Sequence, residues 1–327
     1  MHKKEPFNPI PFMSGNFSQT VFGSLFNLNL FLNSKTEYVR LDDGDLVTLE
    51  IVTPKNWKPT DHTVMLVHGL CGSHKSPYLI RMAKRLTRMG IRSVRMNLRN
   101  CGSGKGLAKH FYHCGLSGDI GACLKHLKKK NPNSPTVLIG FSLGGNLVLK
   151  LAGELGSEAH KYMDQTYAVS PPIKLVSSMR LLSHPNNKMF HQYFIRHLVS
   201  DVYQLHNSFP ELETITFPND LSILDFDELY IAPRIGYSSA FEYYQKSSAI
   251  HVVPDIKIPC KILFAEDDPI IDHNDIDGVP LPKNVEIFKT DRGGHLGFLG
   301  VPNSTYGFRW MDGLLISWIK QFVKNTI

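Results

Sequence analysis

The sequence predicts an α/β fold in which a mostly parallel sheet is flanked by helices. Short β-branched or apolar runs alternate with amphipathic segments up to about residue 172, and the alternation resumes after residue 255. Strands that alternate with helices are typical of parallel sheets covered on both faces. Between residues 173 and 254 helical segments occur without a convincing strand. We therefore expect one structural domain whose sheet is interrupted by a helical insertion.

The domain boundaries follow from this pattern. Residues 1–35 are rich in aromatic residues and irregular, so we expect an N-terminal arm that lies on the domain. Residues 36–172 and 255–327 are expected to form the α/β core, and residues 173–254 the insertion. Insertions between sheet strands often form a lid over an active site. An ordinary layer of packed helices is the alternative interpretation of the insertion.

Local signals predict the first elements. Residues 36–40 and 46–52 are strand-like runs separated by Asp42-Asp43-Gly44-Asp45, which favours a hairpin turn. The apolar run 62–67 predicts a buried strand. Residues 77–89 have helical spacing and a proline at their start, where proline is well tolerated, so we expect a helix there.

The same signals continue along the chain. Residues 92–96 predict a strand, which a loop over 97–106 follows. Residues 116–130 have helical spacing and predict a helix, which ends just before an Asn-Pro pair. Residues 165–169 predict another strand, which leads into a Ser-Pro-Pro segment.

The insertion and the C-terminal third complete the pattern. Helices are expected around residues 187–204 and 238–246 within the insertion. Two further strands, at 261–264 and 285–289, then precede an amphipathic helix over 308–323.

The most informative stretch, residues 136–155, lies within the first part of the core. Residues 136–139 predict a buried strand, and residues 146–155 a helix, with Gly140-Phe141-Ser142-Leu143-Gly144-Gly145 between them. A G-x-S-x-G sequence at a strand-to-helix turn predicts a strained elbow that exposes a serine hydroxyl above the sheet. The glycines on both sides allow the turn to close tightly. Ser142 is therefore the candidate nucleophile.

A serine hydroxyl needs a base that takes its proton and an acid that orients the base. His295 stands in a glycine-flanked loop after the last predicted strand, where it could reach over the sheet to Ser142. Two adjacent acids, Asp267 and Asp268, follow the preceding strand. Asp268 is favoured because it stands one step further along the turn. The chain order Ser, Asp, His is the one found in α/β-hydrolases.

An oxyanion hole is expected beside Ser142. Its backbone N–H donors would come from Leu143, directly after the nucleophile, and from Leu70, where Gly69 lets the loop turn inward. We expect His68 to pack beneath this loop. Cys71 has no evident base in the sequence and is interpreted as a loop residue.

Composition excludes several other classes of function. The chain has 327 residues, 42% hydrophobic, with a net charge of +7, but its basic residues are spread out and form no aromatic-interleaved stripe. We therefore expect no nucleic-acid partner. Five widely spaced cysteines show neither a C-x-x-C pair nor a Cys/His zinc pattern, so neither a disulfide framework nor a metal site is expected.

The N-terminal region leads into no continuous apolar segment that would act as a signal peptide or membrane span. We expect a cytoplasmic protein. Residues 22–32 are nevertheless apolar enough to cover the core or to touch a membrane surface. Peripheral membrane contact through the arm or the lid is therefore left open, as is the oligomeric state.

The chain resembles the YheT-like branch of the α/β-hydrolases, often called the AB hydrolase-4 family, over nearly its whole length. The segments that carry the resemblance are His68-Gly69-Leu70, Gly72-Ser73, Ser76-Pro77-Tyr78, Gly140 to Asn146, Asp267-Asp268-Pro269 and Gly293 to Phe298. Further similar segments are Gln19-Thr20, Tyr112-His113, Phe226-Asp227-Glu228, Gly236-Tyr237 and Tyr243-Tyr244.

The resemblance implies an α/β-hydrolase fold with Ser142 as nucleophile, Asp268 as acid and His295 as base. It also implies carboxylesterase or acylglycerol-lipase chemistry without a cofactor. Two positions depart from the family pattern: Asn100 stands where relatives tend to have glycine, and Arg292 precedes the Gly-Gly-His segment.

The sequence thus favours a serine hydrolase acting on short- to medium-chain acyl esters or acylglycerols, which are small-molecule substrates. Two alternatives stay open. The same triad could transfer the acyl group to an alcohol or lipid acceptor instead of water. The chain could also be a non-catalytic binding module with a hydrolase fold.

Overall fold

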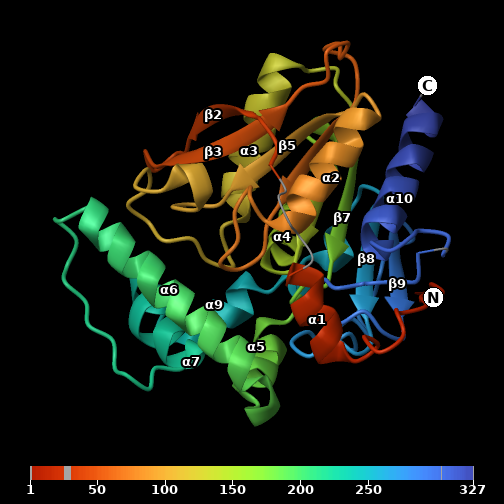
Figure 1. Cartoon of the computed structure of the whole chain (residues 1–327). Coiled ribbons are helices and arrows are strands. Elements are labelled where there is room, and N and C mark those ends of the chain that lie inside the picture. The colour runs from red at the N-terminus through yellow and green to blue at the C-terminus, as the bar shows by residue number, and fades with distance from the viewer. Residues whose placement is uncertain (1, 26–30, 303, 327) are drawn as a thin grey trace.

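A computed structural model describes residues 2–25, 31–302 and 304–326 and shows a nine-stranded sheet between layers of helices (Figure 1). The strand order is β1-β9-β8-β7-β6-β4-β5-β3-β2. Neighbouring strands are parallel except in the pairs β2–β3 and β3–β5. The strands are β1 Lys3–Lys4, β2 Lys35–Arg40, β3 Leu46–Val52, β4 Thr63–Val67, β5 Arg92–Asn97, β6 Thr136–Phe141, β7 Gln165–Val169, β8 Cys260–Ala265 and β9 Val285–Thr290.

Two layers of helices cover the sheet because successive residues of each strand point to opposite faces. In β4, Val64 and Leu66 pack with the two helices of one face, α2 and α10, whereas Met65 and Val67 pack with α3 and α4 on the other. The helices are α1 Asn16–Leu25, α2 Pro77–Arg88, α3 Ser117–Lys130, α4 Leu143–Leu155, α5 Leu175–Ser183, α6 Lys188–Ser208, α7 Ile223–Phe226, α8 Ala232–Arg234, α9 Ala240–Ser247 and α10 Trp310–Thr326.

The predicted fold class is confirmed, and every strand and helix predicted from the sequence is present with slightly shifted ends. The largest shifts lie at the elbow, where the strand runs on through Phe141 and the helix already begins at Leu143, and in α6, which ends at Ser208. Residues 173–254, all of which the structure describes, contain helices and no strand.

The expectation of an irregular N-terminal segment over residues 1–35 was wrong. Its start pairs with β9 as the short strand β1, and α1 forms further along. The Gln19 side chain of α1 is fully buried and bonds to the backbone N–H and C=O of Leu299. Tertiary contacts therefore stabilise a helix that sequence periodicity alone did not show. Of the apolar stretch 22–32, residues 26–30 lie outside the described residues.

The insertion follows β7 and returns to the sheet at β8, so it lies beyond the carboxyl ends of the parallel strands. In Figure 1 its helices α5, α6, α7 and α9 gather on the lower side of the molecule. The buried Asn146 of α4 ties them to the core, because its amide donates to the C=O of Ser247 and accepts the N–H of Ala249.

No helix in the described parts of the chain is long and apolar enough to cross a membrane. All five cysteines are free thiols.

The turn from β6 to α4 is built by close contact between backbones. Ser142 has φ +52° and ψ −123°, a conformation that is strained for any residue other than glycine. A Cβ on Gly140 would lie 2.1 Å from the carbonyl oxygen of Gly144, and a Cβ on Gly144 would lie 2.5 Å from that of His68. Neither position can therefore hold a larger residue without moving the backbone.

We predict that Gly140→Ala lowers the free energy of unfolding by about 3 kcal/mol or more, because the new methyl group overlaps rigid backbone. Urea unfolding monitored by circular dichroism measures the loss. Gly118→Ala is the matched control: this exposed glycine of α3 has nothing within 4 Å of a built Cβ. Gly118→Ala should be neutral or stabilising by up to about 1 kcal/mol. Equal stability of the two variants would contradict the packing described for the turn.

Candidate active site

Three residues far apart in the chain meet at the carboxyl edge of the sheet. Ser142 stands at the turn after β6, Asp268 in the loop after β8 and His295 in the loop after β9. Nε2 of His295 lies 2.9 Å from Oγ of Ser142, and its Nδ1 lies 2.8 Å from Oδ2 of Asp268. The structure thus brings together the three side chains that the sequence analysis selected.

The hydrogen bonds of Asp268 define how the imidazole is oriented. Its Oδ1 accepts the backbone N–H groups of Ile270 and Ile271, at 3.0 and 3.1 Å, which fixes the carboxylate in its own turn. Its Oδ2 is left for Nδ1–H of His295. With the proton on Nδ1, Nε2 is free to accept the proton of the Ser142 hydroxyl.

The neighbouring acid Asp267 bonds to the backbone of the histidine loop and not to the imidazole. Its Oδ1 accepts the N–H of Gly294 at 2.9 Å, and no hydrogen bond joins it to His295 in the described structure. Burial raises the pKa of Asp267, and the Gly294 amide partly offsets this. Asp267 therefore holds the histidine loop, whereas Asp268 contacts the imidazole.

Helix α1 positions the histidine loop from the other side. The Oγ1 of Thr20 accepts the N–H of His295 at 2.9 Å, and Gln19 binds Leu299 at the end of the same loop. Reasoning from spacing missed both residues. The one sequence signal for them was the resemblance, which included the Gln19-Thr20 pair.

The two departures from the family pattern have structural roles outside the triad. Asn100 adopts φ +59°, and its side-chain amide donates to the C=O of Ala108, which holds the intervening loop closed. Asparagine tolerates this left-handed conformation better than most residues. The guanidinium of Arg292 donates to the C=O of Ser14 and so fastens the N-terminal segment to the histidine loop.

The two amides expected to form an oxyanion hole lie next to Ser142. Leu70 and Leu143 both line the cavity at the serine, and neither backbone N–H has a hydrogen-bond partner among the described residues. The loop that carries Leu70 approaches the nucleophile closely, since a Cβ on Gly69 would lie 3.0 Å from Cβ of Ser142. These free donors suit a developing oxyanion.

Neither His68 nor Cys71 takes part in the hydrogen bonds of Ser142. His68 is fully buried, its Nε2 accepts the N–H of Leu98 at 3.1 Å, and burial lowers its pKa to about 4. It packs beneath the oxyanion loop, as expected. Burial raises the pKa of the Cys71 thiol to about 12, so the thiolate needed for nucleophilic attack does not form near neutral pH.

Ser142 lies where two hollows meet. A cavity extends beneath the insertion, between the sheet edge and helices α5, α6, α7 and α9. Its apolar lining includes Leu175, Met179, Leu198, Ile223 and Phe226. A groove between α1 and the start of α6 reaches Ser142 from outside and includes Thr20, Met189, Tyr193 and His295. Leu70, Ser142 and Phe194 border both hollows.

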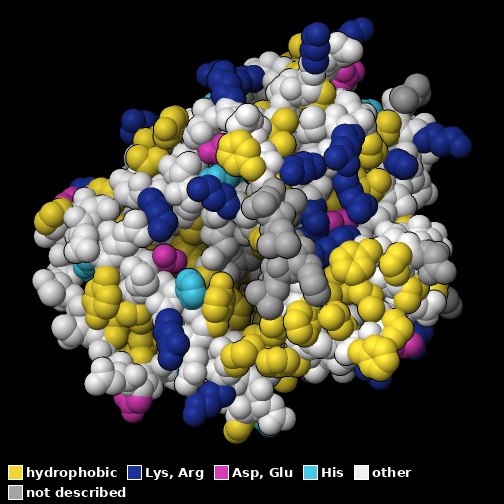
Figure 2. Space-filling view, in the orientation of Figure 1, with side chains coloured by type: hydrophobic (Ala, Val, Ile, Leu, Met, Phe, Trp, Pro, Cys, Tyr) yellow, Lys and Arg dark blue, Asp and Glu magenta, His cyan; other side chains and the backbone are white. Residues whose placement is uncertain are grey.

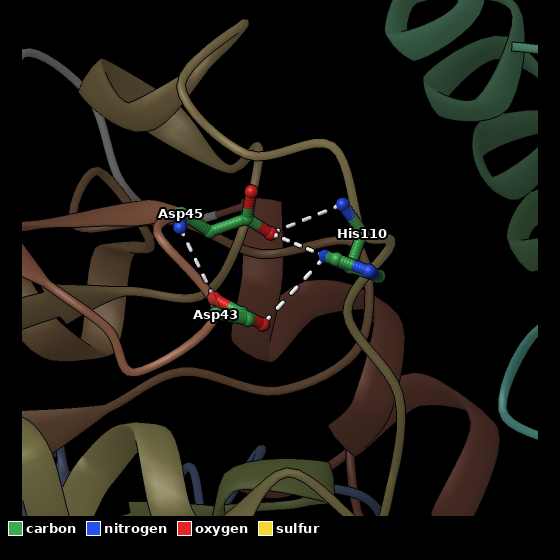
Figure 3. Close-up of side chains that lie close together, drawn as sticks. All are labelled: Asp43, Asp45 and His110. Carbon is green, nitrogen blue, oxygen red and sulfur yellow. Dashed lines mark hydrogen bonds and ion pairs between the residues drawn. The ribbon is translucent and has the colours of Figure 1, made fainter.

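A second cluster, Asp43, Asp45 and His110, brings together groups that bind metals in other proteins (Figure 3). Here the guanidinium of Arg99 already bonds to both carboxylates, at 2.5 and 2.8 Å, and to Asp119. Because an internal cation neutralises the acids, the cluster is an ion-pair network that fixes the His110 loop, and we assign no metal to it.

Comparison with known proteins shows the family of the chain. The family model described as serine aminopeptidase S33 (Hydrolase_4) matches residues 58–279. The Escherichia coli (strain K12) protein named "Putative esterase YheT" is 28% identical over 97% of this chain and 94% of its own length. A monoacylglycerol lipase of Saccharomyces cerevisiae is 27% identical over 79% of this chain and 59% of its own length.

Solved structures show the same fold. The Pyrococcus furiosus esterase Pf2001 superposes with a TM-score of 0.57 at 17% identity, covering 99% of each chain. A proline iminopeptidase of Mycobacterium smegmatis has a TM-score of 0.57 at 15% identity, covering 90% of this chain and all of its own. The matched region, the sheet order and the site together show that the chain is a YheT-like member of the Hydrolase_4 family of α/β-hydrolases, a family of esterase and lipase type.

Proposed function

We propose that this protein is a serine carboxylic-ester hydrolase that forms an acyl-enzyme on Ser142. The observation that carries the proposal is the continuous hydrogen-bond chain from Ser142 through His295 to Asp268, located where two hollows meet. A serine, a neutral imidazole and an oriented carboxylate in this order form a nucleophile that is activated by a general base.

The reaction follows from the geometry. Ser142 Oγ attacks the ester carbonyl while Nε2 of His295 takes the hydroxyl proton. The amides of Leu70 and Leu143 stabilise the oxyanion of the tetrahedral intermediate. His295 then returns the proton to the leaving alcohol, and an acyl-enzyme remains. Water attacks the acyl-enzyme with His295 again as base, which releases the acid and restores the serine. No step requires a cofactor.

The positions of His295 and Leu143 separate the two halves of the substrate. His295 lines the groove, Leu143 lines the cavity, and Ser142 borders both hollows. Because His295 must protonate the leaving oxygen, the alcohol belongs in the groove and the acyl chain in the cavity. In this proposal residues 173–254 act as a lid, since their helices form the roof over the acyl chain.

The cavity favours short- to medium-chain acyl groups. Its largely apolar lining would bury an alkyl chain. Relatives named as a monoacylglycerol lipase and as a medium-chain fatty acid ethyl ester synthase/esterase support acyl esters or acylglycerols as the substrate class.

The second relative also supports acyl transfer as an alternative fate of the acyl-enzyme. An alcohol in the outer groove would replace water as the acceptor and give a new ester. Product analysis with added ethanol separates the two, since hydrolysis releases free acid and transfer releases an ethyl ester.

The first test is the turnover of p-nitrophenyl esters by triad variants. We expect Ser142→Ala to lower kcat by about 10⁴-fold or more, because the nucleophile is lost. Asp268→Asn should lower kcat by about 10³- to 10⁴-fold, because the imidazole loses its oriented acceptor.

Asp267→Asn is the matched control for the acid. The substituted amide can still accept the N–H of Gly294 through its oxygen, so kcat should fall by less than about tenfold. Wild-type turnover in Ser142→Ala would refute the acyl-enzyme mechanism. A wild-type protein that neither hydrolyses these esters nor forms a covalent adduct with a fluorophosphonate probe would instead favour the non-catalytic binding module. Equal losses in the two aspartate variants would refute the assignment of the acid.

We also propose that the groove opens onto a lipid-contacting face. Exposed hydrophobic side chains stand on the N-terminal segment, α1 and the start of α6, namely Phe12, Phe17, Phe22, Met189 and Tyr193. Met189 and Tyr193 line the groove, and the ring of Phe17 packs against that of Phe190 in the groove wall. Figure 2 shows hydrophobic side chains gathered on the face that carries α1. Such a patch beside the entrance would bring an acylglycerol from a membrane surface to the serine.

Co-sedimentation with phosphatidylcholine–phosphatidylserine vesicles tests this face. We expect the double variant Phe12→Ser/Phe17→Ser to bind about threefold less than wild type, because less apolar surface enters the membrane interface. Phe241→Ser on α9 is the control, since Phe241 is 53% exposed and Phe17 48%. If Phe241→Ser loses as much binding as the double variant, the face around the groove is not the contact.

A further inference from the structure

The cavity beneath the insertion contains one acidic side chain among its described lining residues. Asp227 lies in the wall that the insertion contributes, in company with Phe226, Ile223 and Leu198. A carboxyl group facing an apolar cavity is unfavourable unless it gains a hydrogen-bond partner there. Its position is therefore hard to explain by packing alone.

Asp227 has an unused acceptor. Its Oδ2 accepts the hydroxyl of Tyr244 at 2.6 Å, whereas its Oδ1 has no hydrogen-bond donor and neither oxygen has a cationic partner among the described residues. Burial raises the pKa of Asp227 to about 7, and the Tyr244 hydroxyl lowers it only in part. The side chain is thus satisfied on one side only.

The backbone holds this carboxyl firmly. Asp227 begins a π-helical turn, Asp227–Ile231, between α7 and α8, and π-turns are frequent at functional sites. The next residue, Glu228, accepts the N–H of Ala240 at the start of α9 at 2.6 Å. With Tyr244 also on α9, two hydrogen bonds tie the turn to one helix, and the carboxyl is fixed before any ligand arrives.

We propose that Asp227 is a specificity-determining residue that accepts a hydrogen bond from a hydroxyl group on the acyl chain in this cavity. The protein would then prefer esters of hydroxy acids over esters of the unsubstituted acids. This inference rests on the proposed function, in which the acyl chain occupies the cavity beneath the insertion. A hydroxyl donor satisfies Oδ1, whereas a plain alkyl chain leaves it desolvated and unpaired.

The lining favours a neutral donor over an ammonium group. A cation in this cavity would lose its hydration and find a single carboxylate, with no second acid among the described lining residues. The same low polarity that raises the pKa of Asp227 also disfavours a buried cation. A hydroxyl needs only the one acceptor that is present.

The other titratable groups in the cavity lining do not interfere with a pH test of Asp227. Burial raises the pKa values of Cys114 and Tyr243. Burial and the negative charge of Asp227 raise the pKa of Tyr244, so all three groups stay protonated near neutral pH. Burial lowers the pKa of His113 to about 4, so this side chain stays neutral there. No lysine or arginine is among the described lining residues. Between about pH 6 and pH 8 the ionisation that changes in this lining is therefore that of Asp227.

The direction of the pH effect follows. Below its pKa the carboxyl is neutral, and above it the carboxylate accepts a stronger, charge-assisted hydrogen bond from the hydroxyl. The preference for a hydroxy ester should therefore rise from about pH 6 to about pH 8. Comparing two substrates at each pH cancels the titration of the triad, because both acyl groups are transferred by the same residues.

The experiment measures kcat/KM for straight-chain p-nitrophenyl esters, each paired with analogues that carry a hydroxyl at successive carbons. In the wild type we expect at least one hydroxy ester to exceed its unsubstituted partner by about tenfold at about pH 8. Asp227→Asn keeps an acceptor for Tyr244 but loses the charge, so the preference should shrink and lose its pH dependence. Asp227→Leu should reverse the preference.

Tyr244→Phe tests a purely structural role. It removes the hydrogen bond to α9 but keeps the carboxyl, so the preference for the hydroxy ester and its rise with pH should remain. If Tyr244→Phe loses the preference for the hydroxy ester to the same extent as Asp227→Leu, Asp227 acts only through the packing of α9 and the proposal is wrong.

Three further outcomes are decisive. If the wild type hydrolyses the esters but discriminates between the pairs no better than Asp227→Leu, the inference fails while the proposed function stands. If esters of amino acids are preferred over hydroxy esters in an Asp227-dependent way, the ligand is an ammonium and the hydroxyl assignment is overturned. If the wild type hydrolyses no ester, the proposed function fails, and this inference fails with it.

Discussion

The site depends on how closely three backbone segments approach one another beneath Ser142. The end of β6, the first turn of α4 and the end of β4 meet at contacts that leave no room for a Cβ at Gly140 or Gly144. This contact forces Ser142 into its left-handed conformation and points the N-terminus of α4 at the nucleophile. The same contact leaves the Leu143 amide without an internal partner. One packing constraint therefore presents both the hydroxyl and a hydrogen-bond donor.

The sequence predicted the elements that this constraint organises because each has a local signal. Strand ends and helix starts could be located from apolar runs, glycines and prolines, and parallel strands place their carboxyl ends at one edge. That rule was enough to bring Ser142, Asp268 and His295 together. The choice of Asp268 over Asp267 rested only on its place one step further along the turn. The contacts that distinguish the two acids, Gly294 N–H to Asp267 and His295 Nδ1 to Asp268, depend on the folded loops.

Other parts of the site have no local signal. Helix α1 has no acidic residue in its first turn and no basic residue in its last, and its contacts with the histidine loop are almost 280 residues away in sequence. Such long-range contacts are invisible to periodicity. The same is true of Asp227: in the sequence it has no signal beyond a polar residue next to Phe226, and only the folded insertion places it in the lining of the cavity.

The geometry of the triad distinguishes the alcohol end of an ester from its acyl end. A proton must leave toward His295 and negative charge must develop toward Leu143, so the two ends of an ester are distinguished before any pocket selects them. The groove is rimmed by the exposed side chains of Met189 and Tyr193. The cavity lies beneath helices that Asn146 fastens to the core, and its lining includes Asp227, which Tyr244 holds by a hydrogen bond. If the acyl chain occupies the cavity, as proposed, a polar group on that chain needs a hydrogen-bond partner in an apolar lining, so we expect the stronger selection on the acyl side.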